Sequence, residues 1–271
     1  MESGIVLVTG ASSGLGQAAA EHLAQKGYTV YGTSRRAPLE GESRVGVRPL
    51  RMDVDDSASV RQGIDLLLRR EGRIDVVINC AGYGMAGAVE STPVEAFKAQ
   101  LETNFYGTLR VCQAVLPHMR ERRAGMIINV SSVGGLIAIP FQSMYSASKF
   151  AVEGVTEALR LEARPFGVRV VLVEPGDFAT RFTANRRAIE PDAAYAANMR
   201  RAVAVMEHDE QHGARPAQFA RLIEWIVRSK SPRLRYMVGP FYERAAVWLK
   251  ILLPSRLFEW AFSKYYQQEQ R

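Results

Sequence analysis

The chain has 271 residues, of which 47% are hydrophobic and 23% are charged, and this composition excludes a disordered or collagen-like protein. Lys and Arg number 35 against 28 Asp and Glu, which gives a net charge of +7. Residues 1–180 hold 19 side chains of each sign, so the last 91 residues carry the whole excess.

The sequence carries no signal for export or for crossing a membrane. No run of about 18 uninterrupted apolar residues is present, and residues 1–4 lead directly into a strand-like segment without the features of a signal peptide. Cys80 and Cys112 lie in apolar stretches without metal-site or disulfide spacing. We therefore expect a cytoplasmic protein with reduced structural thiols and no bound metal.

Short apolar strands alternate with amphipathic helices along the chain. The predicted strands are Ile5–Thr9, Tyr28–Thr33, Val47–Met52, Ile74–Ile78, Met126–Val130, Arg169–Val173 and Leu234–Val238. The predicted helices are Leu15–Lys26, one that begins at an N-cap Ser57, Glu102–Arg122, Ser143–Arg164 and Pro216–Ser229. Strands that are apolar on both faces and separated by helices indicate a parallel α/β sheet covered on both sides. Because no linker or repeat divides the chain, we expect a single domain over 1–271.

A glycine-rich turn joins the first predicted strand to the first predicted helix. Glycines stand at positions 10, 14 and 16, a spacing that differs from G-x-G-x-x-G. Glycine lets the backbone approach a pyrophosphate closely, and a helix N-terminus supplies unpaired N–H donors. The turn therefore predicts a nucleotide site.

Two arginines, Arg35 and Arg36, follow the second predicted strand, where an NAD-selective fold places an acid. An arginine at this point accommodates the 2′-phosphate of NADP. We expect NADP(H) to be preferred over NAD(H).

Tyr145 and Lys149 lie four residues apart at the start of a predicted helix, and this spacing places them on one face. An unperturbed phenol has a pKa near ~10, and a neighbouring cation lowers it. Tyr145 is therefore a candidate general acid and base for a carbonyl and an alcohol. A Y-x-x-x-K pair alone is common on protein surfaces, so the prediction depends on its neighbours.

Those neighbours are present, and over residues 4–180 the chain resembles the short-chain dehydrogenase/reductase family. The motifs that carry the resemblance stand in the family's order: Thr9–Gly16, Asp53-Val54, Asn79-Cys80-Ala81-Gly82, Asn104, Ser132, Tyr145–Lys149 and Pro175-Gly176 with Thr180. The resemblance implies a Rossmann-type, doubly wound fold with a mainly parallel seven-stranded sheet and helices on both faces. Cys80 departs from the family, which usually has a second asparagine there.

The resemblance also implies a catalytic tetrad of Asn104, Ser132, Tyr145 and Lys149. Ser132 would hydrogen-bond the substrate oxygen, with the adjacent Ser131 as its competitor for that role. Lys149 would bind the nicotinamide ribose and lower the pKa of Tyr145. Asn104 would hold a water that relays protons to Lys149.

The remaining motifs resemble the family's cofactor contacts at the carboxyl ends of the strands. The expected contacts are Gly10, Ser12, Ser13, Gly14, Leu15, Gly16, Arg35, Arg36, Asp53, Val54, Asn79, Ala81, Gly82, Tyr145, Lys149, Pro175, Gly176, Phe178 and Thr180.

Residues 181–271 are expected to hold the substrate lid, the last strand and a basic, aromatic extension. Aromatic and aliphatic residues crowd into 241–266 among Arg244, Lys250, Arg256 and Lys264. Such a segment covers an apolar pocket or subunit contact, lies on a membrane surface as a peripheral anchor, or forms a loose tail. Its aliphatic character argues against nucleic-acid binding.

These features predict an NADP(H)-dependent oxidoreductase that interconverts a ketone or aldehyde and an alcohol on an apolar substrate. The resemblance points to relatives that act on steroids, retinoids or other lipids, and to a homodimer or homotetramer. The alternatives are a reductase of acyl-carrier-linked 3-oxo substrates, a non-catalytic NADP-binding regulator and, more distantly, a sugar-nucleotide epimerase or dehydratase.

Overall fold

A computed structural model of the chain describes residues 4–36 and 45–266, so most of the N-terminal segment examined for a leader lies outside the described residues. The centre of the molecule is a seven-stranded, wholly parallel sheet in the order β3-β2-β1-β4-β6-β7-β9. Its strands are β1 (Ile5–Val8), β2 (Thr29–Ser34), β3 (Val47–Arg51), β4 (Val76–Asn79), β6 (Gly125–Val130), β7 (Val168–Pro175) and β9 (Arg235–Val238).

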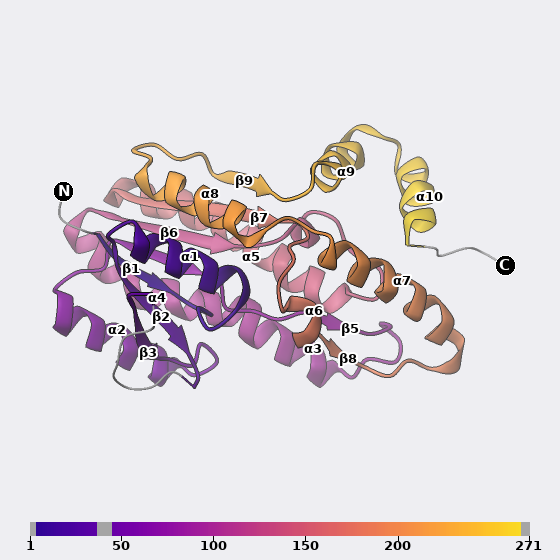
Figure 1. Ribbon diagram of the computed structural model, residues 1–271, viewed down its shortest axis with the longest axis horizontal. Coiled ribbons are helices and arrows are strands. Elements are labelled where there is room, and N and C mark those ends of the chain that lie inside the picture. Colours follow the sequence, from indigo (N-terminus) through magenta and orange to yellow (C-terminus); the bar gives the residue numbers. More distant parts are fainter. Residues whose placement is uncertain (1–3, 37–44, 267–271) are drawn as a thin grey trace.

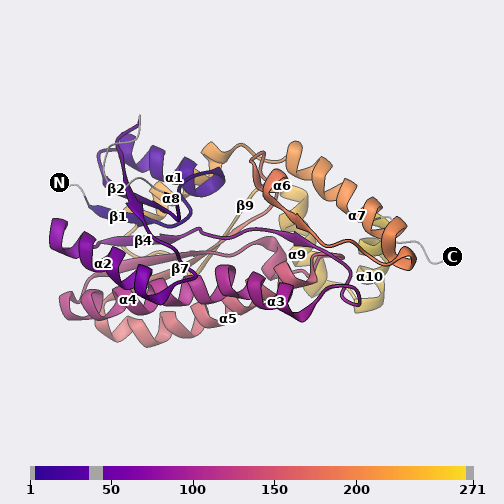
Figure 2. The ribbon, with the colours of Figure 1, turned by 90° about the horizontal axis from the view of Figure 1, so that it is seen from below.

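Helices cover both faces of this sheet (Figures 1 and 2). One face carries α1 (Gly14–Gln25) and α8 (Pro216–Arg228), and the other carries α2 (Ser57–Glu71), α4 (Gly107–Arg122) and α5 (Ser143–Ala163). The structure thus confirms the predicted doubly wound α/β fold with seven strands.

The strand sequence explains why two helical layers are needed. Because neighbouring side chains of a strand point to opposite faces, β1 sends Ile5 and Leu7 to one core and Val6 and Val8 to the other. The first core contains the apolar stripes of α2 and α4, and the second contains those of α1 and α8. A strand that is apolar at every position is stable only when both of its faces are covered.

Two local predictions differ from the structure. The N-cap of α2 is Asp56, whose side chain accepts a hydrogen bond from the Ala58 N–H, and Ser57 is the first residue of the helix. The long helix predicted from Glu102 is preceded by α3 (Val94–Leu101) and begins with a π-helical turn, Glu102–Tyr106, before α4. Such widened turns are frequent at functional sites.

The segment after β7 holds more regular structure than its polar sequence predicts. It forms α6 (Phe182–Asn185), β8 (Arg187–Ala188) and α7 (Ala193–Gln211), and β8 pairs with β5 (Met85–Ala86). Beyond β9, α9 (Phe241–Leu252) and α10 (Ser255–Tyr265) stand at the carboxyl end of the sheet (Figure 1). Among the described residues, no helix is long and apolar enough to cross a bilayer.

Candidate active site

The loops that follow β1 and β4 meet at the carboxyl edge of the sheet. The chain continues from β1 toward β2 on one side, whereas β4 lies on the other side, so these loops flank the switch point where an open α/β sheet is expected to have its ligand crevice. The Thr9 hydroxyl joins the two loops, because it accepts hydrogen bonds from the backbone N–H groups of Cys80 (3.0 Å) and Ala81 (3.1 Å). Residues 71 and 72 positions apart are thereby held in one site.

The glycine turn is shaped for a close approach between backbones. Gly10 has φ +68°, and a Cβ at this position would lie 2.8 Å from the Ala81 Cα. Helix α1 begins directly after the turn, and its N-cap Ser13 makes no side-chain capping hydrogen bond. The first N–H groups of α1 are therefore available to an anion, which fits a cofactor pyrophosphate.

Arg35 and Arg36 lie exposed at the end of β2, and Asp53 and Val54 follow β3. Burial raises the pKa of Asp55, and the charge of Arg35 opposes this rise, which places the guanidinium near the loop after β3. The structure therefore brings Arg35 to the edge where the adenosine end of a dinucleotide is expected.

The polar residue Asn79 is turned away from this edge. Its side chain is 3% exposed and donates hydrogen bonds to the Asn129 Oδ1 (2.8 Å) and to the Cys112 Sγ (3.4 Å). The amide of Asn79 thus ties β4 to β6 and α4, and among the predicted contacts of this loop only Ala81 and Gly82 remain beside the crevice.

Asn104 lies in the π-helical turn and is completely buried. Its Nδ2 donates to the Tyr83 carbonyl (3.1 Å) and to the Ser148 Oγ (3.0 Å), and its Oδ1 accepts from the Tyr83 N–H (3.1 Å). The side chain therefore fastens the loop after β4 to α5, the helix that carries Tyr145 and Lys149.

Ser132, Tyr145 and Lys149 converge at the end of β6. The Lys149 Nζ donates to the Val130 carbonyl at 2.9 Å and lies 5.8 Å from the centre of the Tyr145 ring. The Ser132 Oγ accepts from the Gly134 N–H at 3.0 Å and hydrogen-bonds the Tyr145 phenol. Three of the four predicted tetrad side chains thus lie within one cluster, and Asn104 supports it from behind.

Burial sets the electrostatics of this cluster. It raises the pKa of Tyr145 above its ordinary value, and the hydrogen bond with Ser132 opposes this rise. It also lowers the pKa of Lys149 to about 8. Desolvation of the phenolate is the largest cause of the raised pKa of Tyr145, and the expected lowering by Lys149 stays a prediction.

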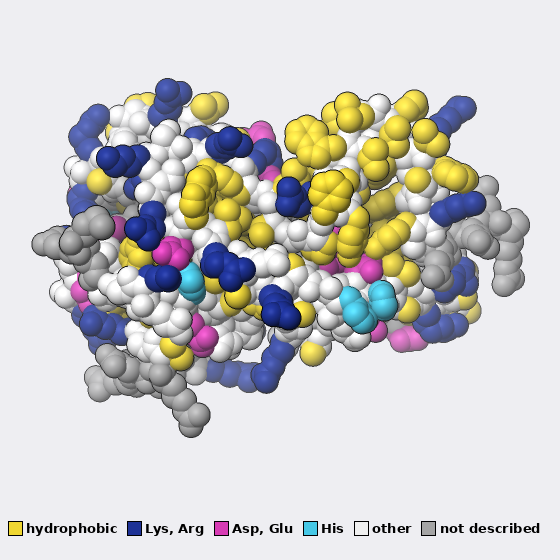
Figure 3. Space-filling model, turned by 45° about the horizontal axis from the view of Figure 1, so that its top comes forward, with side chains coloured by type: hydrophobic (Ala, Val, Ile, Leu, Met, Phe, Trp, Pro, Cys, Tyr) yellow, Lys and Arg dark blue, Asp and Glu magenta, His cyan; other side chains and the backbone are white. Residues whose placement is uncertain are grey.

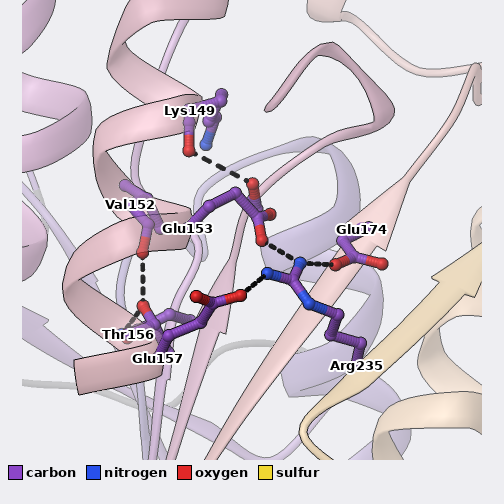
Figure 4. A network of polar contacts seen from close by, with 9 residues as sticks. Lys149, Val152, Glu153, Thr156, Glu157, Glu174 and Arg235 are labelled. Carbon is purple, nitrogen blue, oxygen red and sulfur yellow. Dashed lines mark hydrogen bonds and ion pairs between the residues drawn. The ribbon is translucent and has the colours of Figure 1, made fainter. Parts of the chain in front are cut away.

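A partly buried ionic network supports α5 from the side of the sheet (Figure 4). Arg235 on β9 pairs with Glu174 on β7 at 2.5 Å and also with Glu153 and Glu157 on α5. Glu153 is one helical turn beyond Lys149, so the network fixes the helix directly behind the cluster. No local sequence pattern predicts this network, because its members are separated by up to 82 residues.

The two candidate serines face different surroundings. Ser131 is 3% exposed, and its hydroxyl donates to the Lys149 carbonyl at 3.5 Å, inside the protein. Ser132 lines a cavity of about 250 Å³. The geometry therefore gives only Ser132 direct access to a substrate oxygen.

The cavity is closed by the C-terminal extension, which supplies Tyr242 and Glu243 from α9, Phe262 and Tyr265 from α10, and Tyr266, which follows α10. Gly176 and Asp177, which follow β7, form another part of its wall. Two acids, Asp177 and Glu243, were not predicted as site residues. The first stood within a motif interpreted as a cofactor contact, and the second stood in a segment interpreted as aromatic and basic.

Residues 4–191 match the family model described as short chain dehydrogenase. The chain is 44% identical over 269 residues to a 3-ketodihydrosphingosine reductase of Bacteroides thetaiotaomicron, covering 98% of this chain and 99% of that protein. It is 40% identical over 195 residues to rat estradiol 17-beta-dehydrogenase 1, covering 67% of this chain and 56% of that protein.

Solved structures show the same architecture. A short-chain dehydrogenase from Streptomyces avermitilis superposes with a TM-score of 0.83 at 30% identity, covering 98% of both chains. A serine dehydrogenase in its closed form, complexed with NADP⁺, superposes with a TM-score of 0.75 at 26% identity, covering 88% of this chain and 95% of that chain.

Proposed function

Because this chain is a member of the short-chain dehydrogenase family, an oxidoreductase that acts on CH–OH or C=O groups, we propose that it reduces a lipid ketone with NADPH or oxidises the matching alcohol. The observation that carries the proposal is the cluster of Ser132, Tyr145 and Lys149, of which Ser132 lines the cavity. The nicotinamide cofactor supplies or accepts the hydride.

The side chains of the cluster handle the proton. Ser132 hydrogen-bonds the carbonyl oxygen of the substrate, and the Tyr145 hydroxyl donates its proton to that oxygen as the alcohol forms. Because burial raises the pKa of the Tyr145 phenol, the cation of Lys149 is needed to stabilise the phenolate that remains after proton transfer. Asn104 holds α5 against the loop after β4 and so keeps these groups in register.

The residues of the crevice fit NADP(H). The free N–H groups at the start of α1 and the close approach at Gly10 suit a pyrophosphate, while Arg35 suits a 2′-phosphate. That a similar protein was solved with NADP⁺ supports the same preference. In this proposal NAD(H) is the poorer cofactor.

One relative that shares almost the full length of this chain is named for a lipid ketone, 3-ketodihydrosphingosine. We assign the same substrate class here, an amphiphilic ketone with a long aliphatic chain. The similarity to a steroid dehydrogenase over two thirds of the chain supports an apolar substrate in general. A reductase of acyl-carrier-linked substrates is the weaker candidate, because no described residue that lines the cavity is basic.

A substitution at Tyr145 tests the proposal. Tyr145→Phe removes the proton donor, and we expect kcat for ketone reduction with NADPH to fall by about 10²–10⁴ while NADPH still quenches or shifts protein fluorescence. Tyr106→Phe is the matched control, since Tyr106 is exposed, and it should keep full activity. A Tyr145→Phe enzyme with most of its activity would contradict the mechanism, and binding of NADPH by a wild type without turnover would favour the regulator.

We also propose that the C-terminal extension rests on a membrane surface. Large apolar side chains of α9 and α10 are exposed, among them Phe241 (78%), Leu252 (74%) and Trp260 (57%), and they gather on one face of the molecule (Figure 3). Arg244, Lys250, Arg256 and Lys264 lie in the same two helices, which suits anionic lipid headgroups.

Vesicle sedimentation tests this interface. We expect the protein to sediment with vesicles that contain phosphatidylglycerol and to bind neutral phosphatidylcholine vesicles more weakly. The double change Trp248→Ser and Trp260→Ser should abolish sedimentation, whereas Trp225→Ser, at an exposed tryptophan of α8, should not. Equal sedimentation of the Trp248/Trp260 double variant and the Trp225→Ser variant would contradict the membrane assignment.

The long helices α4 and α5 support a homo-oligomer, as the family resemblance implies. Phe150 and Leu161 on α5 are 42% and 70% exposed, and a second copy would cover them. Light scattering on the purified chain should give a multiple of the 30.1 kDa mass, and Leu161→Glu should reduce it.

A further inference from the structure

The cavity beside Ser132 is acidic in a protein with a net charge of +7. Four carboxylates line it, from Asp177, Asp209, Glu210 and Glu243, and among the described residues of its wall there is no Lys, Arg or His. A cavity of this sign attracts a cationic group and repels an anionic one.

Two of these carboxylates already have partners. Glu210 is paired with the Arg186 guanidinium and accepts from the Thr183 hydroxyl, and Asp209 accepts from the Tyr265 hydroxyl at 2.6 Å. Asp209 and Glu210 therefore hold α6, α7 and α10 together around the cavity through these contacts.

Asp177 and Glu243 form a pair without a cation. The Asp177 N–H donates to both oxygens of Glu243, at 3.1 and 3.0 Å, and the two carboxyl groups hydrogen-bond each other. In the described part of the chain neither forms an ion pair with a basic side chain. Burial and the contact with Glu243 raise the pKa of Asp177 to about 9, so the pair shares a proton at neutral pH.

Gly176 leaves the space that the Glu243 carboxylate occupies beside Asp177. A Cβ at position 176 would lie 1.4 Å from a Glu243 carboxylate oxygen, so only glycine leaves room for that carboxylate between β7 and the cavity. The Glu243 carboxylate is thereby seated against the backbone that precedes Asp177.

Gln142 offers a second polar contact to a ligand. It is 3% exposed and lines the same cavity. Its side-chain amide can both donate and accept, so it suits a ligand hydroxyl or carbonyl.

We infer that Asp177 and Glu243 bind a protonated amine on the carbon next to the reacting carbonyl, and that Gln142 hydrogen-bonds a neighbouring hydroxyl of the same substrate. The inference rests on the proposed function and deepens it, because it narrows the lipid ketone to a long-chain α-amino ketone. The ammonium takes the place of the proton that the two carboxyl groups share, so it is held by charge in the same cavity that Ser132 lines.

A metal ion is the other cation that carboxylates bind. No group of three or more His, Cys, Asp or Glu among residues 4–36 and 45–266 has a geometry suited to holding one. Two carboxyl groups joined by a hydrogen bond can accept the several N–H donors of one ammonium. A hard metal ion such as Ca²⁺ needs about six or more oxygen ligands, which this pair does not supply.

The test compares two substrates on the full-length enzyme. The probes are 3-ketodihydrosphingosine and 3-octadecanone, which has the same chain length but neither the amine nor the neighbouring hydroxyl, each presented with NADPH in the same detergent. For the wild type we expect kcat/KM for the amino ketone to exceed that for the plain ketone by at least ~30-fold. Equal values for both ketones would overturn the inference and leave the proposed function standing, whereas reduction of neither would overturn the proposed function itself.

Variants assign the effect to the pair. Glu243→Gln and Asp177→Asn should each lower kcat/KM for the amino ketone by at least ~30-fold, mainly through KM, and change the value for 3-octadecanone by less than about threefold. Glu259→Gln, which removes an exposed carboxylate of α10, is the matched control and should change neither. Equal losses on both substrates would show a merely structural role, and the wild-type comparison decides the question if a variant fails to fold.

Discussion

The ammonium nitrogen of Lys149 lies 5.8 Å from the centre of the Tyr145 ring, one helical turn along α5. Both side chains are buried, and Lys149 is held in place by its hydrogen bond to the Val130 carbonyl. Burial lowers the pKa of Lys149 to about 8, so its charge depends on pH close to the physiological range. The same relationship makes the cofactor site sensitive to pH.

NADPH affinity should fall as the pH rises through about 8, because Lys149 loses its proton in the free enzyme and must regain it to donate to the ribose. We expect Kd from fluorescence titration to rise by up to about tenfold between pH 7 and 9.5. Lys149→Met should bind weakly with no such dependence, while Lys98→Met, at an exposed lysine, should follow the wild type. A flat wild-type profile would contradict this.

Ser132→Ala should lower kcat for ketone reduction by about 10²–10³, because it removes the hydrogen bond to the substrate oxygen. Ser131→Ala should lower kcat far less and act mainly on stability, since Ser131 contacts the Lys149 backbone. Steady-state rates and thermal melts of both variants distinguish the roles. The reverse order of kcat losses would transfer the role to Ser131.

Arg35→Ala should weaken NADPH binding by about 10- to 100-fold, because it removes a charged hydrogen bond to the 2′-phosphate. NADH binding should change little, since NADH has no phosphate there. Arg69→Ala serves as the control, because Arg69 is an exposed arginine of α2. An equal loss for both cofactors would show that Arg35 acts on the shared part of the dinucleotide.

Arg235→Met should destabilise the fold by about 3 kcal/mol, because it leaves Glu174, which is 1% exposed, without its cation. Arg228→Met removes an exposed pair with Glu224 on a single helix and should cost less than about 1 kcal/mol. Urea unfolding at constant pH measures both. Similar free energies of unfolding for the two variants would mean that the network does not stabilise the protein.

Stability should fall as the pH rises from about 4.5 to about 7. Burial and the neighbouring Glu153 raise the pKa of Glu174 to about 7, so the folded protein keeps a proton that the unfolded chain releases near 4.5. The folded state therefore binds more protons than the unfolded state in this interval, and its advantage is lost by pH 7. Glu174→Gln should flatten this part of the curve of unfolding free energy against pH, and an unchanged slope would assign the dependence to other groups.

Much of the site was predictable because its contacts are local. Tyr145 and Lys149 share one helix face through their spacing, and the glycines of residues 10–16 lie in one turn. The order of the motifs along the chain identified the family, and the family implied the sheet. In each case the relevant information lies within a few residues or in the sequence order itself.

The direction in which a polar side chain points was not predictable in this way. Asn79 stands in a cofactor motif, yet its amide is turned into the interior toward Asn129, 50 residues away. Ser131 and Ser132 are neighbours with the same chemistry, and only the path of the chain after β6 places one in the core and the other on the cavity.

The sequence by itself determined that the chain alternates strands and helices, that its first turn suits a phosphate and that a tyrosine and a lysine share a helix face. Only the tertiary structure decided what the cavity recognises. Asp177 and Glu243 are 66 residues apart and meet because β9 returns beside β7 and starts α9 over Gly176. Such a pairing depends on long-range packing, which no local pattern of residues encodes.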